Sequence, residues 1–198
     1  MSLSNTAITF GPSVEELLER NKQYAAGHKP IPSLLARTKN DPKMNGPHVL
    51  IVSCLDSRAN PLTFLGLNLR ECLILRNVAG RFSSAASDIA ALDTFFHISQ
   101  IILVHHSNCG ASHITKQQVL DGICQKRPEF VTTTAGGFGE LEARLPMKED
   151  NRDSLVEDLK RAKTCGFLRK DLVDGIVGLW LDVETGLVTK VFPDDDGN

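Results

Sequence analysis

Two short clusters of cysteine, histidine and charged side chains stand out in this sequence. Residues 54–58 read CLDSR, and residues 106–109 read HSNC. Thiolate and imidazole groups are the ligands that a tetrahedral zinc ion prefers, and a site with three protein ligands leaves a fourth position for water or a carboxylate. The two clusters therefore predict a zinc site held by Cys54, His106 and Cys109.

Each cluster directly follows an apolar run of the kind found in buried strands. Residues 48–53 read HVLIVS, and residues 101–104 read IILV. The carboxyl ends of parallel strands lie at the same edge of a sheet, where side chains from neighbouring strands can converge on one point. We expect Cys54 to reach the metal from one strand and His106 and Cys109 from the next, so that the site joins two strand–helix units.

Asp56 and Arg58 lie within the first cluster and predict a carboxylate–guanidinium pair beside the metal. Zinc lowers the pKa of a water molecule and so supplies hydroxide near neutral pH. While Arg58 holds it, the Asp56 carboxylate can accept a hydrogen bond from that hydroxide and orient it towards an electrophilic carbon. Released from Arg58, Asp56 can rotate onto zinc as a fourth ligand and close the site. A salt bridge without a chemical role is a third interpretation of the pair.

The other histidines and cysteines near these clusters are expected to have structural roles. Adjacent residues of a strand point to opposite faces, so His105 is expected to be packed or hydrogen-bonded while His106 faces the metal. His113 is expected at the surface. The chain has five cysteines, and the three outside the clusters are Cys72, Cys124 and Cys165.

The bulk composition limits the classes of partner. The 198-residue chain carries a net charge of -2 and has a pI near 6.3, which gives no reason to expect nucleic acid or an anionic membrane as a partner. No apolar run approaches the roughly 20 residues of a transmembrane helix. Residues 1–6 lack the pattern of a secretory signal, and an odd number of cysteines argues against a disulfide framework. We therefore expect a cytoplasmic protein without a nucleic-acid or membrane partner.

Strand-like and helix-like segments alternate along the chain. The predicted strands span residues 48–54, 71–75, 101–105, 176–183 and 187–192. The predicted helices span residues 13–27, 61–65, 84–97 and 114–120, and another begins at residue 153. Residues 121–147 have the least clear pattern, and residues 132–137 are typical of a loop. The alternation predicts an α/β fold with a mostly parallel central sheet, flanking helices and an antiparallel edge strand.

We expect the chain to form a single domain in three parts. Residues 1–47 supply an N-terminal helix, opened by a capping box at Ser13, and an extended, proline-rich arm. Residues 48–192 form the α/β core. Residues 193–198 form an acidic tail.

The sequence resembles the β-class carbonic anhydrases. The resemblance rests on three motifs, CLDSR at residues 54–58, ILRNVAG at residues 74–80 and VHHSNCG at residues 104–110. It extends over most of the chain, from about residue 13 to residue 192, and so implies the α/β fold of that family.

The resemblance also implies a site and an assembly. Carried over by motif position, the ligands of one zinc ion per chain are Cys54, His106 and Cys109, and the dyad beside the metal is Asp56 and Arg58. The family is built from homodimers, often doubled to homotetramers, with the substrate clefts at the dimer interface.

Two departures from the usual family pattern lie near the mouth of this site. The chain has Ser107 and Asn108 where the family often has Thr-Asp, and it has Val78-Ala79-Gly80 where the family often has Ala-Gly-Gly. Neither departure replaces a zinc ligand. Both bear on the choice of substrate.

The resemblance implies reversible hydration of carbon dioxide to bicarbonate as the activity. The alternative is a carbonyl sulfide hydrolase, which converts carbonyl sulfide and water to hydrogen sulfide and carbon dioxide at the same kind of zinc site. The size and polarity of the pocket decide between such substrates. A third possibility is a structural zinc protein without catalysis, although such sites usually have four cysteine or histidine ligands.

Overall fold

The computed structural model describes residues 11–30, 47–68, 70–128 and 137–194. The chain divides into two compact units, residues 1–40 and residues 41–198, of which the second carries both sequence clusters. Within the described ranges no helix is long and apolar enough to cross a membrane.

The smaller unit contains α1 (Val14–Ala26), which begins where the sequence predicts. The Ser13 hydroxyl accepts a hydrogen bond from the backbone N–H of Glu16 at 3.1 Å, and the Glu16 carboxylate accepts one from the N–H of Ser13 at 2.8 Å. This reciprocal pair satisfies two N–H groups that the start of a helix leaves without partners. The predicted capping box is confirmed, whereas most of the arm expected after α1 lies outside the described residues.

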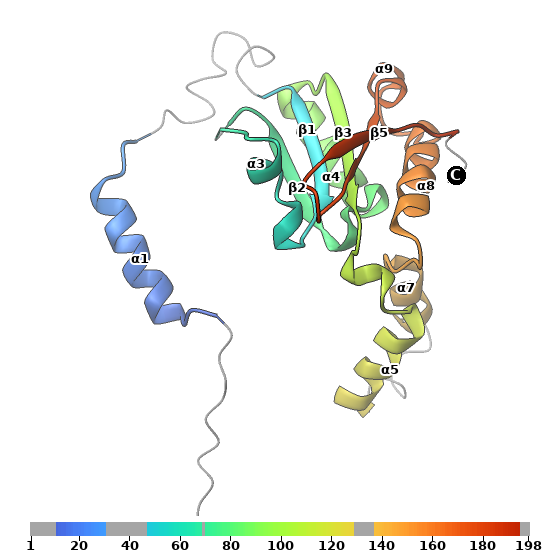
Figure 1. The fold of residues 1–198 in the computed structure, drawn as a ribbon, viewed down its shortest axis with the longest axis horizontal. Helices are drawn as coiled ribbons and strands as arrows, with labels where there is room; N and C mark the ends of the chain where they lie inside the picture. The colour runs from blue at the N-terminus through green and yellow to red at the C-terminus, as the bar shows by residue number, and fades with distance from the viewer. Residues whose placement is uncertain (1–10, 31–46, 69, 129–136, 195–198) are drawn as a thin grey trace, which may run out of the picture. The chain divides into compact units, whose positions relative to one another are not determined.

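A five-stranded sheet forms the centre of the larger unit (Figure 1). Its strands are β1 (Val49–Cys54), β2 (Leu73–Asn77), β3 (Gln100–His106), β4 (Val177–Leu181) and β5 (Val188–Val191). Their order across the sheet is β2-β1-β3-β4-β5; the first four strands run parallel, and β5 is antiparallel to β4. The predicted fold class is confirmed, including the antiparallel edge strand.

β2 begins later than the predicted strand at residues 71–75, because a turn precedes it. The Glu71 carboxylate accepts hydrogen bonds from the backbone N–H of Asn68 at 2.8 Å and from the Asn68 side-chain amide at 2.9 Å. These bonds keep Glu71 in the turn, so the strand starts after Cys72 and continues to Asn77. The predicted boundaries of this strand are therefore wrong by two residues.

Helices connect the strands and cover the sheet (Figure 1). The α-helices described in the larger unit are α3 (Pro61–Phe64), α4 (Phe82–Phe96), α5 (Lys116–Lys126), α7 (Gly137–Arg144), α8 (Asn151–Lys163) and α9 (Lys170–Asp174). Short 3₁₀ helices follow β1, β2 and β3 and are named η2 (Ser57–Ala59), η3 (Val78–Gly80) and η4 (Gly110–Ser112).

The helix boundaries differ from the sequence pattern where tertiary contacts decide them. α4 begins before the predicted residue 84 because the Phe82 N–H donates a hydrogen bond to Oδ2 of Asp158 at 3.0 Å. The region 121–147 holds the end of α5 and all of α7. Of the predicted loop at residues 132–137, only the last residue is described, and it begins α7. Neither α7 nor α9 is predicted by the sequence pattern.

Two apolar clusters lie on opposite faces of the sheet. On one face α4, α8 and α9 pack against the strands, and Leu103 of β3 and Leu159 of α8 are part of this larger cluster. On the other face a smaller cluster contains Val104 together with Cys54 and Cys109. Successive strand residues point to opposite faces, so β3 serves both clusters at once.

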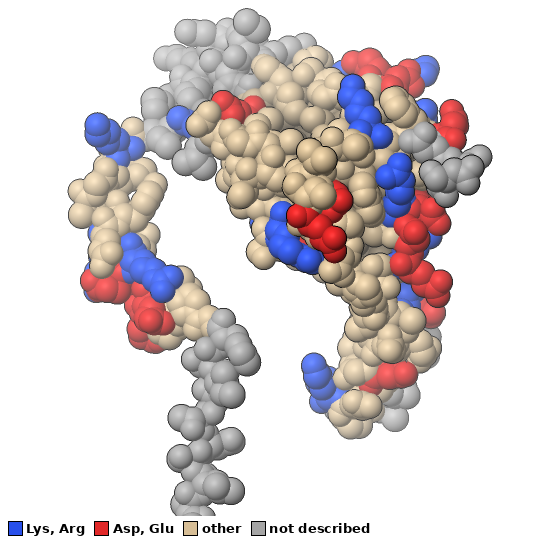
Figure 2. All heavy atoms as spheres, in the orientation of Figure 1, with Lys and Arg blue, Asp and Glu red and all other residues tan. Residues whose placement is uncertain are grey.

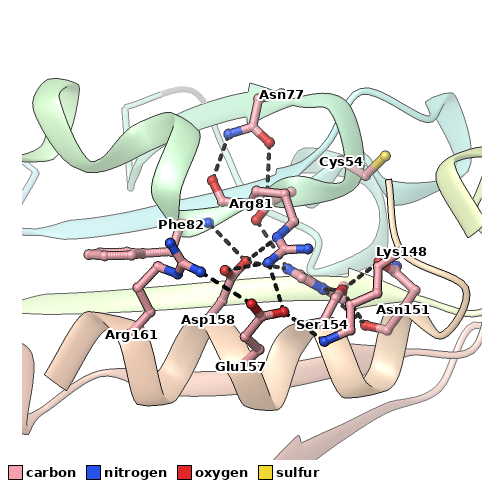
Figure 3. Close-up of polar contacts among 12 residues, drawn as sticks. Cys54, Asn77, Arg81, Phe82, Lys148, Asn151, Ser154, Glu157, Asp158 and Arg161 are labelled. Atoms are coloured by element: carbon pink, nitrogen blue, oxygen red, sulfur yellow. Dashed lines mark hydrogen bonds and ion pairs between the residues drawn. The ribbon is translucent and has the colours of Figure 1, made fainter. Parts of the chain in front are cut away.

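A buried polar network joins α8 to the end of β3 (Figure 3). Asp158 is fully buried and accepts hydrogen bonds from Nε and Nη2 of Arg81 at 2.8 and 3.0 Å. Nε2 of His105 lies 3.5 Å from Oδ2 of Asp158, and its Nδ1 lies 2.9 Å from Oγ of Ser154. His105 is therefore hydrogen-bonded in the interior, as predicted.

We expect Asp158→Asn to lower the free energy of unfolding by about 3–5 kcal/mol, because it removes the buried carboxylate that accepts two hydrogen bonds from the buried Arg81. Urea unfolding followed by circular dichroism measures the change. The control is Asp174→Asn, which removes an exposed carboxylate paired with Lys170 at 2.7 Å and should cost less than about 1 kcal/mol. Equal effects of the two substitutions would contradict a structural role for the network.

Candidate functional site

The structure brings the two sequence clusters together at the carboxyl ends of β1 and β3. These strands pair in parallel with Ser53 opposite Val104, so both end at the same edge of the sheet. The possible ligand atoms of Cys54, His106 and Cys109 all lie within 4.8 Å of one another, and the three residues are buried. The two Sγ atoms are 3.9 Å apart. This group could hold a metal ion through two sulfur atoms and one nitrogen atom.

His106 presents one ring nitrogen to this group without a competing partner. Its Nδ1 lies 2.9 Å from the carbonyl oxygen of Ser107, which can only accept, so Nδ1 carries the proton and donates it. Nε2 then carries the lone pair, and among the described residues this buried atom has no hydrogen-bond partner. A buried acceptor without a donor is costly, and a metal ion at this point removes the cost. The residues present therefore fit a metal centre.

The two thiols influence each other's ionisation. The Cys109 thiol donates a hydrogen bond to Cys54 and lowers the pKa of Cys54, an effect opposed by burial and helped by His106 and by the N–H of Asp56 at 3.4 Å. The same hydrogen bond, together with burial, raises the pKa of Cys109. One thiolate thus forms easily and the second resists ionisation. A divalent cation between the sulfur atoms is what stabilises both thiolates together.

Asp56 and Arg58 form the predicted pair beside the group. Nε of Arg58 donates to Oδ1 of Asp56 at 3.0 Å, and Nη2 donates to Oδ2 at 2.6 Å. The backbone N–H of Arg58 also donates to Oδ1, at 2.9 Å. The hydrogen bonds from Arg58 lower the pKa of Asp56 to about 2, so the carboxylate is ionised at neutral pH. Of the two arrangements considered for Asp56, the structure has the one in which Arg58 holds it.

Arg76 and Asn108 position this loop, a role that the sequence pattern does not assign to them. Arg76, within the ILRNVAG motif, donates from Nε to the carbonyl of Cys54 at 2.9 Å and from Nη2 to the carbonyl of Asp56 at 2.6 Å. The carbonyl of Asn108 accepts a hydrogen bond from Nη2 of Arg58 at 3.0 Å. Asn108 has a φ of 50°, a left-handed conformation that asparagine tolerates better than most residues. Their only sequence signal is their place inside the motifs.

The η3 turn packs against both strand ends. Gly80 has a φ of +72°, and a Cβ atom there would lie 2.9 Å from the carbonyl oxygen of Val104 and 3.0 Å from the nitrogen of Cys54. Glycine is therefore required at this position. Ala79, where the family motif often has glycine, also takes a positive φ, of 65°. With alanine at this position of the turn, the Sγ atoms of Cys54 and Cys109 lie 3.9 Å apart.

We call Cys54, His106 and Cys109 the metal group. The other residues considered in the sequence lie outside it. His113 is exposed, and its Nε2 lies 2.8 Å from Oδ1 of Asn108. Ser107, the other departure from the family pattern, accepts a hydrogen bond from the N–H of Val183 at 3.0 Å and so ties the end of β3 to the segment after β4. The three half-buried cysteines outside the group are Cys72, Cys124 and Cys165.

Comparison with known proteins extends the likeness beyond the site. A family model described as carbonic anhydrase matches residues 49–188, which include both clusters. The β-carbonic anhydrase 1 of Mycobacterium tuberculosis is 25% identical over 181 residues, which cover 90% of this chain and 98% of that protein. The carbon disulfide hydrolase of Saccharolobus solfataricus is 30% identical over 107 residues, which cover 54% of this chain and 47% of that protein.

Solved structures share the fold. A carbonic anhydrase from Streptococcus mutans superimposes with a TM-score of 0.68 at 25% identity, over 90% of this chain and 96% of that chain. An apo form of carbon disulfide hydrolase superimposes with a TM-score of 0.61 at 23% identity, over 91% of this chain and 90% of that chain. With the family model matching most of the chain, the fold and the motifs agree. This chain belongs to the β-class carbonic anhydrase family of enzymes.

Proposed function

We propose that this protein catalyses the reversible hydration of carbon dioxide to bicarbonate and a proton, at one zinc ion per chain held by Cys54, His106 and Cys109. The observation that carries the proposal is the buried group of two thiols and one unpartnered imidazole nitrogen beside an ionised carboxylate. Sulfur and nitrogen ligands suit zinc, and three protein ligands leave a position open for chemistry.

The side chains around this group have separate tasks. When bound, zinc supplies hydroxide near neutral pH by lowering the pKa of a water molecule. Asp56, ionised and therefore acceptor-only, accepts a hydrogen bond from the hydroxide. This bond orients a lone pair of the hydroxide oxygen towards the carbon atom of the substrate. Arg58 holds both oxygens of Asp56 and so keeps this carboxylate from occupying the open position.

Hydrolysis of carbonyl sulfide is the second candidate, favoured by the identity to a carbon disulfide hydrolase. Carbon dioxide, carbonyl sulfide and carbon disulfide are linear molecules with an electrophilic carbon. Attack of hydroxide on the carbon of carbonyl sulfide forms the same carbon–oxygen bond and gives a monothiocarbonate. Its carbon–sulfur bond then breaks as the hydroxyl proton moves to sulfur, which releases carbon dioxide and hydrosulfide, and water protonates the hydrosulfide to hydrogen sulfide. Carbon dioxide is the first candidate because the match to β-carbonic anhydrase 1 covers nearly the full length of both chains.

One kinetic experiment tests the proposed reaction and the role of Asp56. We expect the zinc-loaded wild type to have a larger kcat/KM for carbon dioxide than for carbonyl sulfide, measured by stopped-flow indicator assay and by hydrogen sulfide release. We expect Asp56→Asn to keep its zinc but to lose about 100-fold or more in kcat, because an amide is not an acceptor-only group.

Asp88→Asn is the matched control, since Asp88 is exposed on α4 and lies outside the metal group. It should keep wild-type rates. A larger kcat/KM for carbonyl sulfide would replace the first candidate by the second, and turnover of neither substrate would contradict both. Wild-type kcat in Asp56→Asn would show that the pair with Arg58 is only structural.

Cys109→Ser is expected to lose bound zinc, because a neutral hydroxyl is a poor substitute for a thiolate ligand. Mass spectrometry of the metal content of dialysed protein measures the loss. Cys124→Ser, which changes a half-buried cysteine outside the group, should retain one zinc ion per chain. Full occupancy of zinc in Cys109→Ser would exclude this residue as a ligand.

A reducing compartment such as the cytoplasm, which keeps the thiols available, suits such a site.

We also propose that the protein is a homodimer, or a homotetramer built from dimers. The apolar side chains that α1 exposes are Val14, Leu17, Leu18 and Tyr24. A helix of 13 residues is marginal on its own in water, so this apolar side needs a partner. On the face drawn in Figure 2, charged groups of both signs gather along α8 and α9. A second copy of the chain could cover the apolar side of α1.

Sedimentation velocity at micromolar concentration is expected to give a dimer or a tetramer. The double variant Leu17→Glu/Leu18→Glu should shift the protein towards the monomer, because burying two added charges opposes association. Gln23→Glu adds a charge on the polar side of α1, by its helical spacing, and should associate as the wild type does. A fully active monomeric wild type would contradict the proposed assembly.

A further inference from the structure

A second candidate site lies on the face of the sheet that α4 and α8 cover. It is a cavity of about 740 Å³ bounded by the first turns of α4 and α5, by the segment that joins α7 to α8, and by α8 itself. Its polar lining includes Ser83, Ser84, Lys116, Lys148, Glu157 and Arg161, and Arg81 also borders it. No residue of the metal group and neither residue of the Asp56–Arg58 pair lines this cavity.

Positive charge dominates the lining. The lining has one carboxylate, that of Glu157, and five cationic side chains, those of Arg81, Lys116, Arg144, Lys148 and Arg161. Glu157 accepts hydrogen bonds from Lys148 at 2.7 Å, from Arg161 at 3.2 Å and from Arg81 at 3.3 Å (Figure 3). Lys148 and then the two arginines lower the pKa of Glu157 to about 2, so it stays ionised. Asp158 and Glu140, which do not line the cavity, pair with Arg81 and Arg144 of the lining. Positive charge remains in excess when these two carboxylates are counted as well.

Several donors of the cavity have no partner among the described residues. Arg81 is only 7% exposed and uses Nε and Nη2 for carboxylates, whereas its Nη1 makes no hydrogen bond within the described ranges. Lys116 is half-buried and has no hydrogen bond or ion pair with any described residue. The N-cap residue of α4, Arg81, makes no side-chain cap, and Asp158 accepts only the N–H of Phe82 in the first turn. The N–H groups of Ser83 and Ser84 have no intrahelical acceptor at this end of the helix.

We propose that this cavity binds the phosphate group of a phosphorylated small molecule. A phosphate dianion accepts many hydrogen bonds at once, and it suits a site that combines guanidinium, ammonium, hydroxyl and helix N-terminal donors. The cavity volume falls within the range of about 300–1,000 Å³ typical of small-molecule sites, so an inorganic ion fills only part of it. Leu145, Pro146 and Met147 provide an apolar wall for the rest of the ligand.

Calorimetric titration of the zinc-loaded full chain with inorganic phosphate and with adenosine monophosphate tests the proposal. Both are expected to bind saturably at low ionic strength and more weakly as salt is added, whereas adenosine should not bind. Lys116→Gln should weaken binding about tenfold, through loss of one charge-assisted hydrogen bond. Ser84→Asp should abolish binding, because it places a negative charge in the cavity at a helix position where a carboxylate stabilises α4.

Two further variants separate this cavity from other sources of binding. Lys190→Gln removes an exposed charge on β5, and Arg58→Ala removes the cation beside the metal group. Both should bind phosphate and adenosine monophosphate as the wild type does. The proposal would be overturned if neither probe binds at millimolar concentration, if Lys116→Gln and Ser84→Asp bind like the wild type, or if binding is lost in Arg58→Ala alone.

Discussion

The parallel pairing of β1 with β3 is the constraint on which the rest of the structure depends. Because Ser53 lies opposite Val104, the two strands end together, and the residues that follow them meet at one edge of the sheet. The η3 turn can pack across this junction only because Gly80 has no Cβ. A one-residue slip of either strand would turn its side chains to the opposite face and would separate Cys54 from the other two members of the metal group.

Adjacent histidines at the end of β3 divide two tasks between the two faces of the sheet. The unpartnered Nε2 of His106 lies beside the buried thiols, whereas His105 joins the network of Asp158 and Arg81 that ties α8 to the strand. A buried network of this kind is weak as a source of stability, but it is costly to break. The position of α8, and with it one wall of the cationic cavity, therefore depends on the same strand as the metal group.

The proximity of Cys54, His106 and Cys109 could be predicted from the sequence, because these residues follow apolar runs typical of buried strands. The fold class followed from the alternation of those runs with helical segments. Arg76 and Asn108 could not be assigned, because their roles depend on carbonyl groups brought near by the fold. The same holds for α4, whose first N–H is capped by Asp158 from 76 residues away. Local polar bonds, such as that between Asn68 and Glu71, moved a strand boundary that apolar patterning alone placed too early.

We propose that the parallel strand ends build a metal site of two sulfur atoms and one nitrogen atom. X-ray absorption at the zinc edge of the wild-type protein at neutral pH measures these ligands. We predict zinc bonded to two sulfur atoms, one imidazole nitrogen and one further light atom. Zinc bonded to four sulfur atoms, or to nitrogen and oxygen atoms only, would contradict the site described for Cys54, His106 and Cys109.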